Sequence, residues 1–172
     1  MSDKPVITKK YTHDELIMSS ACNNNDIGVE AGNFISWTGE TRVWGSGCNA
    51  PLSAWTPVPL PVAGRITVVG GSGAPNDPCG DVAGFPIPIP SPSGGTYSIK
   101  LGNNQVEAQA ERITHQFIVQ PADTDFIYQY AVVLQNPSTH VPSDMPYFDF
   151  VMLDSLNDTI PCSYQHYISS PT

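Results

Sequence analysis

The stretch Tyr97-Ser98-Ile99-Lys100-Leu101-Gly102-Asn103-Asn104 decides the fold class of this chain. Its first five residues alternate between apolar and polar, so an extended backbone would place the apolar side chains on one face. Gly102-Asn103-Asn104 is typical of a turn, because glycine and asparagine tolerate left-handed backbone angles. The stretch therefore predicts a half-buried β-strand that ends in a turn.

The same period of two continues downstream of this strand. Residues 113–119 place His115 and several apolar side chains on one side. Residues 126–134 are rich in aromatic and β-branched side chains and apolar on both sides, which predicts a central strand. Alternation over residues 147–153 predicts a last strand.

Upstream, the period of two predicts shorter strands, first at Ile27 and Val29 and then at residues 34–37, 42–44 and 65–69. Long loops, residues 45–64 and 70–95, separate these strands and are rich in proline and glycine. Residues 85–90 alternate apolar residues with prolines, which lack the backbone donor, so this piece can lie only along a sheet edge.

Many short strands, frequent turn signals and no sustained helical period predict an all-β fold. We expect a β-sandwich with long loops rich in proline and glycine. The length of 172 residues suits one domain. Residues 1–21 are expected to form a polar N-terminal segment, and residues 22–172 the sandwich domain.

The charge of the chain excludes some partners. Seven Lys and Arg residues against sixteen Asp and Glu residues give a formal net charge of −9. No basic cluster extends beyond Lys9-Lys10, so we expect no nucleic-acid partner and no attraction to anionic membranes. No run of about 18 apolar residues exists, which argues against a membrane-spanning helix.

The four cysteines leave two interpretations open. Two disulfides in any of three pairings are possible, and so are small buried thiols; the residues are Cys22, Cys48, Cys79 and Cys162. No Cys-x-x-Cys pair occurs and no histidine lies at metal spacing from a cysteine, so a zinc site is not expected.

Enzymatic motifs are weak in this sequence. The glycine-rich residues 70–73 are followed by two prolines rather than a helix, which argues against nucleotide binding. Glu107 and Glu111 could supply the two carboxylates of a glycosidase, but an ion pair with a neighbouring arginine is the simpler interpretation. We expect no catalytic activity.

Tryptophans in and beside the loops of the first half suggest a binding function instead. The flat face of an aromatic ring can stack on a sugar ring, and Trp55 lies among small and polar residues where exposure is expected. We therefore predict Trp55 and Trp44 as glycan-binding residues. The alternative interpretation is that such rings belong to the core.

Several strings in this sequence form an ordered set. They are Gly32-Asn33-Phe34-Ile35-Ser36-Trp37-Thr38-Gly39, then Tyr97-Ser98-Ile99-Lys100-Leu101-Gly102-Asn103, Ala108-Gln109-Ala110-Glu111-Arg112-Ile113, the run of residues 128–137, residues 146–154 and Ile160-Pro161-Cys162. Together, over about residues 22–168, they resemble a domain of large adhesin-like surface proteins of Bacteroidetes. These proteins carry gliding-motility-associated or type IX secretion C-terminal regions.

The resemblance implies a secreted or cell-surface β-sandwich of jelly-roll, galactose-binding-like type. Relatives of that architecture hold a structural calcium, with a glutamate of the opening motif as ligand; Glu30 matches this position, and Asp26 is the second candidate. Such domains usually continue with further strands and carry a signal peptide and a sorting region. The chain is therefore expected to lack its last strands and to offer an open sheet edge to another protein chain.

Two short patterns resemble sites at which Bacteroidetes attach O-glycans to exported proteins. They are Asp154-Ser155-Leu156 and Asp158-Thr159-Ile160, so Ser155 and Thr159 are predicted acceptors.

Taken together, the sequence predicts a non-catalytic adhesion or binding domain that recognises a glycan or another surface ligand. Two alternatives stay open: a structural assembly module completed by a strand of a partner chain, and an accessory domain of a secreted hydrolase.

Overall fold

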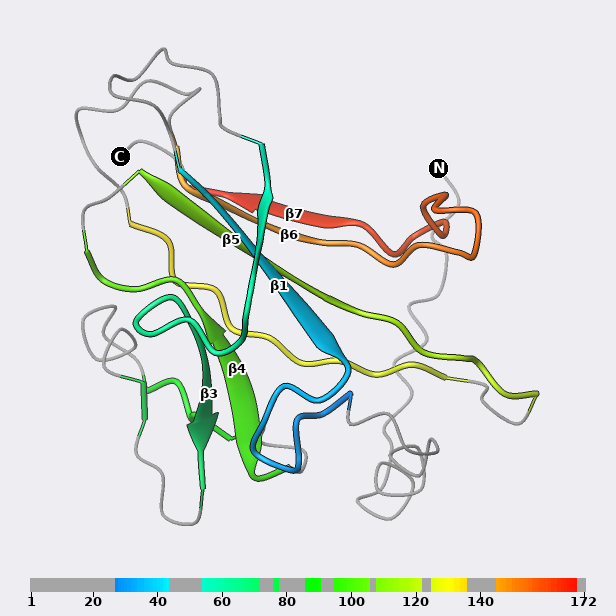
Figure 1. The fold of residues 1–172 in the computed structure, drawn as a ribbon, viewed down its shortest axis with the longest axis horizontal. Helices are drawn as coiled ribbons and strands as arrows, with labels where there is room; N and C mark the ends of the chain where they lie inside the picture. Colours follow the sequence, from blue (N-terminus) through cyan, green and yellow to red (C-terminus); the bar gives the residue numbers. More distant parts are fainter. Residues whose placement is uncertain are drawn as a thin grey trace, which may run out of the picture. The chain divides into compact units, whose positions relative to one another are not determined.

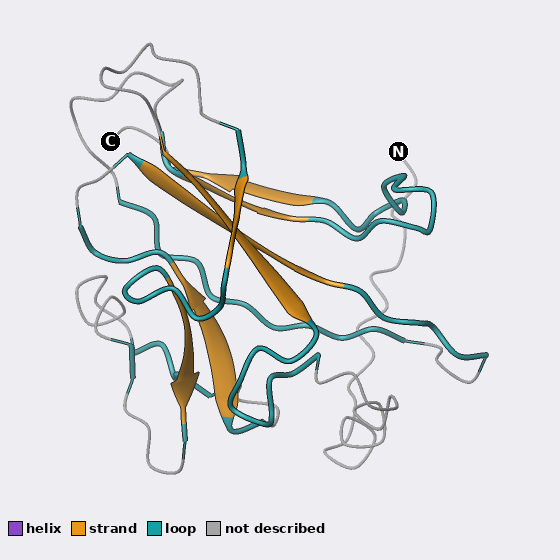
Figure 2. Ribbon diagram, viewed as in Figure 1, coloured by secondary structure: helices purple, strands orange, loops and turns teal. Residues whose placement is uncertain are grey.

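The computed structural model describes residues 27–43, 54–71, 76–77, 86–90, 95–105, 108–121, 125–135 and 145–169. All regular structure in these ranges is β, and none of them contains a helix (Figures 1 and 2). The prediction of an all-β chain is confirmed. Contacts divide the chain into two compact units, Met1–Gln129 and Tyr130–Thr172. The strands are β1 (Trp37–Val43), β2 (Thr56–Val58), β3 (Ile66–Gly70), β4 (Tyr97–Leu101), β5 (Gln109–His115), β6 (Tyr147–Phe150) and β7 (Gln165–Ile168).

The first unit contains a three-stranded antiparallel sheet in the order β2-β1-β5. All seven residues of β1 pair with β5, and the register sets Glu40 opposite Arg112 and Thr41 opposite Glu111. Because successive side chains point to opposite faces and paired residues share a face, these two cross-strand pairs lie on different sides of the sheet. One face carries Glu40 and Arg112, and the other carries Glu111.

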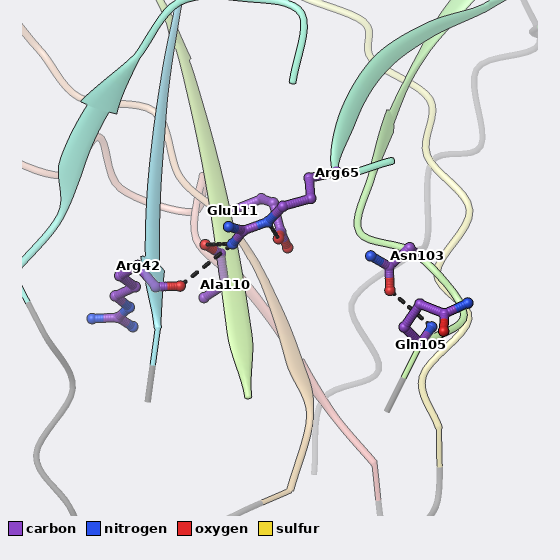
Figure 3. A network of polar contacts seen from close by, with 6 residues as sticks. All are labelled: Arg42, Arg65, Asn103, Gln105, Ala110 and Glu111. Carbon is purple, nitrogen blue, oxygen red and sulfur yellow. Dashed lines mark hydrogen bonds and ion pairs between the residues drawn. The ribbon is translucent and has the colours of Figure 1, made fainter. Parts of the chain in front are cut away.

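A second sheet in this unit pairs β3 with β4 along their whole length. Arg65, directly before β3, connects it to the three-stranded sheet. Its Nε donates to Oε1 of Glu111 at 2.6 Å, and its Nη2 donates to the carbonyl oxygens of Ala110 and Arg42 at 3.2 and 3.4 Å. Figure 3 shows this network, with the Arg42 carbonyl turned toward Arg65 and the Arg42 side chain extending the other way.

Aromatic rings continue the apolar side of β1 and β5. Trp37 contacts His115 at a centroid distance of 4.8 Å, and His115 is followed by Phe117 at 6.1 Å. Phe117 stacks on Phe126 at 5.4 Å, and Phe126 contacts Tyr128. The row thus holds the segment after β5 against residues 125–128 through side chains.

The second unit contains the antiparallel pair β6 and β7, with Asp149 opposite His166 and Phe148 opposite Tyr167. Phe148, Tyr167 and Tyr130 contact one another on one face. Between the strands, an isolated bridge from Leu153 to Thr159 closes a tight loop.

Two strand predictions are wrong. Residues 126–134 were expected to form a central strand, but the structure has no β-strand in residues 125–135, and the two units divide inside this run, after Gln129. Ile27 and Val29 were expected to alternate in a strand. Val29 instead has a φ of 53° and accepts a hydrogen bond from Gly32, which closes a turn, and its side chain is buried. The buried side chain offsets the cost of the left-handed backbone.

Most other strands differ only in their bounds, but β2 and β7 were not predicted. The structure has one strand, β1, where two were predicted at 34–37 and 42–44. It begins only at Trp37, because the preceding residues form a turn in which the Trp37 amide donates to the Phe34 carbonyl. β2 lies inside the predicted loop 45–64, where Pro57 is tolerated because β2 is an edge strand. β3, β4 and β6 lie where strands were predicted, and β5 includes the start of the predicted segment 113–119.

The predicted N-terminal segment, residues 1–21, lies outside the described residues. Within the part of the chain that the structure describes, no helix is long and apolar enough to cross a membrane.

We predict that the ion pairs on the two faces of the sheet contribute unequally to the free energy of unfolding. The side chains of Arg65 and Glu111 are only 17% and 11% exposed, so Glu111→Ala leaves a guanidinium largely buried without its carboxylate. We expect this substitution to lower the free energy of unfolding by about 2 kcal/mol in urea denaturation. Glu40→Ala, on the other face, removes a carboxylate from the more exposed Arg112 and is expected to cost at most about 1 kcal/mol. Equal losses in the two variants would contradict this difference.

Candidate functional site

The Trp55 cluster, defined as Glu40, Arg42, Trp55 and Arg112, lies on the face of the three-stranded sheet opposite Glu111. Glu40 and Arg42 are two residues apart on β1, Arg112 is opposite Glu40 on β5, and Trp55 directly precedes β2. Strand alternation therefore brings residues from all three neighbouring segments to one surface. No spacing along the sequence indicates this grouping.

Two guanidinium groups lie against the ring of Trp55. The Cζ atom of Arg42 is 4.2 Å from the ring centroid, and that of Arg112 is 4.6 Å away. Both distances lie within the range of cation–π attraction. Glu40 holds Arg112 in place, since its Oε2 accepts from Nε at 2.6 Å and lies 2.5 Å from Nη2. The ring is half-buried, and two charged groups contact it.

The two predicted glycan-binding tryptophans have different outcomes. Trp55 is half-buried, so it is neither a core residue nor a freely exposed ring. Trp44 lies outside the described residues.

The second unit carries another cluster, the Tyr164 surface, defined as Tyr147, Asp149, Tyr164 and His166. Oδ1 of Asp149 accepts hydrogen bonds from Nδ1 of His166 at 2.6 Å and from the hydroxyl of Tyr164 at 3.1 Å. The imidazole of His166 contacts the rings of Tyr147 and Tyr164 at centroid distances of 5.8 and 6.2 Å. All four residues are exposed.

The carboxylate of Asp149 orients His166 with Nε2 pointing away from the bond, an arrangement that also serves a general base. No serine or cysteine of the described residues is hydrogen-bonded to His166. The Tyr164 surface combines aromatic rings, a carboxylate acceptor and an imidazole. Sequence reasoning missed it because Asp149 and His166 are far apart along the chain and become neighbours only through the register of β6 and β7.

The predicted calcium ligands are only partly described. Oε2 of Glu30 accepts a hydrogen bond from the backbone amide of Thr96 at 2.9 Å, which attaches the turn before β1 to the start of β4. Asp26 lies outside the described residues. Calcium takes six to eight oxygen ligands, and no group of three or more His, Cys, Asp or Glu suited to a metal occurs in the described ranges. The calcium site stays a prediction.

The predicted glycosylation acceptors lie in the loop closed by the Leu153–Thr159 bridge. Oδ1 of Asp154 accepts from the amides of Leu156 and Asp158 at 2.8 and 3.0 Å, and Asn157 has a φ of 65°. Ser155 and Thr159 are both exposed. Their accessibility fits modification, which itself stays a prediction.

Of the four cysteines, only Cys162 is described. It is exposed and forms no disulfide with any described residue. Cys22, Cys48 and Cys79 lie outside the described ranges, so both interpretations of the cysteines stay open. Of the two glutamates weighed as glycosidase carboxylates, Glu111 is ion-paired with Arg65, and Glu107 is not described.

No family model, no curated protein and no solved structure matches this chain.

The pKa of Tyr164 is raised above its ordinary value. Desolvation is the largest cause, and the hydrogen bond that the hydroxyl donates to Asp149 is the second. The fold therefore favours the neutral hydroxyl. This contribution to stability is present below about pH 10, the pKa of an unfolded tyrosine, and is lost as the pH rises through the higher folded value.

Of these two causes of the raised pKa, the hydrogen bond to Asp149 is the one that a single substitution can remove. We expect Asp149→Asn to lower the pH at which Tyr164 ionises, measured by NMR on tyrosines labelled at the ring carbon that bears the hydroxyl. Tyr164→Phe assigns the signal. Asp158→Asn removes the same charge from a residue that makes no hydrogen bond to Tyr164, so a larger shift in this control would refute the assignment.

Proposed function

We propose that this chain is a non-catalytic adhesion or binding domain that is secreted or displayed at the cell surface and that recognises glycans. The fold proposed with it is a β-sandwich of jelly-roll, galactose-binding-like type. One observation supports the function most: a tryptophan ring, half-buried on the polar face of a sheet, is held in place by charged side chains.

A fixed aromatic ring suits sugar recognition for a physical reason. The apolar face of a sugar ring loses little on leaving water, and an aromatic face offers it a large flat contact. Ordering a side chain on binding costs about 0.5–1.5 kcal/mol, and a ring that is already immobilised avoids this cost. Polar groups around the ring then select the ligand through hydrogen bonds. The Trp55 cluster combines these two features.

A glycan array followed by calorimetry on the best ligand tests the proposal. We expect Trp55→Ala to weaken binding by about tenfold or more, because the stacking surface is lost. Tyr164→Ala, in the other unit, tests the competing Tyr164 surface and is expected to leave binding unchanged. Unchanged binding in Trp55→Ala, or loss in Tyr164→Ala alone, would contradict a site at Trp55. Thermal unfolding of both variants shows whether the fold is kept.

A second function, the structural assembly module, is favoured by a different observation. Among the described residues only three apolar side chains are buried, Val29, Ile66 and Met145, whereas seventeen large ones are exposed. In the sheet order β2-β1-β5, no described strand pairs with the outer edge of β5. Addition of a strand from another chain would use that edge. A mass equal to that of the monomer in light scattering at all concentrations would count against self-assembly.

A further inference from the structure

We propose that the glycan bound at Trp55 is acidic, and that Arg112 receives its anionic oxygen group, a carboxylate or a sulfate ester. This inference rests on the proposed function, because it names the ligand class of the same site.

Positive charge is scarce in this chain, and half of the basic side chains that the structure describes lie at one ring. The structure describes four of the seven basic residues, Arg42, Arg65, Lys100 and Arg112. Two of them, Arg42 and Arg112, lie against Trp55. These two guanidinium groups share one ring in a protein whose formal net charge is −9. A local positive charge beside an aromatic ring favours a ligand that combines a ring with an anion.

The donors of Arg112 are only partly used. A guanidinium has five N–H donors. Glu40 occupies the edge formed by Nε and Nη2 with a single carboxylate oxygen. No described residue accepts a hydrogen bond from Nη1, and the side chain is 46% exposed. The outer edge, formed by Nη1 and Nη2, therefore keeps a parallel pair of N–H groups, which matches the two oxygens of a carboxylate or a sulfate.

Arg65, in the same unit, has a structural role and provides a comparison for the donors of Arg112 that are in use. Its Nε and Nη2 donate to Glu111 and to two backbone carbonyls, and its side chain is 17% exposed. Lys100 is likewise paired, with Asp77 at 2.8 Å. Arg112 differs from both because Glu40 binds only the guanidinium edge formed by Nε and Nη2. The edge formed by Nη1 and Nη2 is left without a carboxylate among the described residues. Glu40 and Trp55 fix the guanidinium, so a ligand meets donors that are already oriented.

The test compares two forms of one sugar. Calorimetry measures binding of the full chain to oligogalacturonate and to its methyl ester, in which the carboxylate is neutral and the ring is unchanged. A sulfated galactan oligosaccharide without uronate is the third ligand and separates sulfate from carboxylate recognition. We expect the wild-type chain to bind at least one acidic ligand about tenfold more tightly than the ester, and this preference to weaken with added salt.

Variants then assign the preference to Arg112. Arg112→Gln is expected to lose the acidic preference while keeping any binding to the ester. Arg112→Lys keeps the charge but not the paired donors, so an intermediate loss is expected. Lys100→Gln is the control for overall charge and is expected to keep the preference. Thermal unfolding of each variant shows that the fold is kept.

The outcomes separate the two proposals. If acid and ester bind alike and Trp55→Ala abolishes both, the acidic ligand class is wrong and the proposed function stands. An unchanged preference in Arg112→Gln overturns the role of Arg112. If no saccharide on a broad array binds, both the proposed function and the acidic ligand class are wrong.

Discussion

The pairing of β1 with β5 is the interaction on which the rest of the first unit depends. Seven consecutive residues of each strand are in register, and a shift by one residue would turn every side chain to the other face. The present register brings two acid–base pairs to opposite sides. Glu111 meets Arg65 on the side of β3 and β4, and Glu40 meets Arg112 on the side of Trp55. The same ladder thus builds both the internal connection of the unit and its candidate binding surface.

The two pairs use one kind of chemistry for different purposes. Arg65 is shielded and donates to a carboxylate and to two carbonyls of the β1–β5 ladder, so it stabilises the packing of the two sheets. Arg112 is more exposed and shares the ring of Trp55 with Arg42. Burial and the number of donors in use, rather than residue type, distinguish a structural arginine from one that is available to a ligand.

Local pattern predicted the fold class and most strand positions. Alternation and the turn after Leu101 were sufficient for β4, since the Gln105 amide donates to Asn103 where the turn was expected. Residues 126–134 show where pattern fails: the structure has no β-strand in residues 125–135, although Phe126 stacks on Phe117. Of the candidate site, Trp55 was predicted from its polar neighbours. Its arginine partners were not, because β1, β2 and β5 are brought together only by long-range pairing.

The register of β1 and β5 is the central claim, and cross-strand nuclear Overhauser effects between backbone protons test it most directly. The structure predicts contacts between Thr38 and Thr114, between Glu40 and Arg112, and between Arg42 and Ala110. Contacts that instead join Glu40 to Glu111 or to Ile113 would show a shifted ladder. Such a result would separate Arg112 from Glu40 and Trp55, and it would contradict both the site and the function proposed for it.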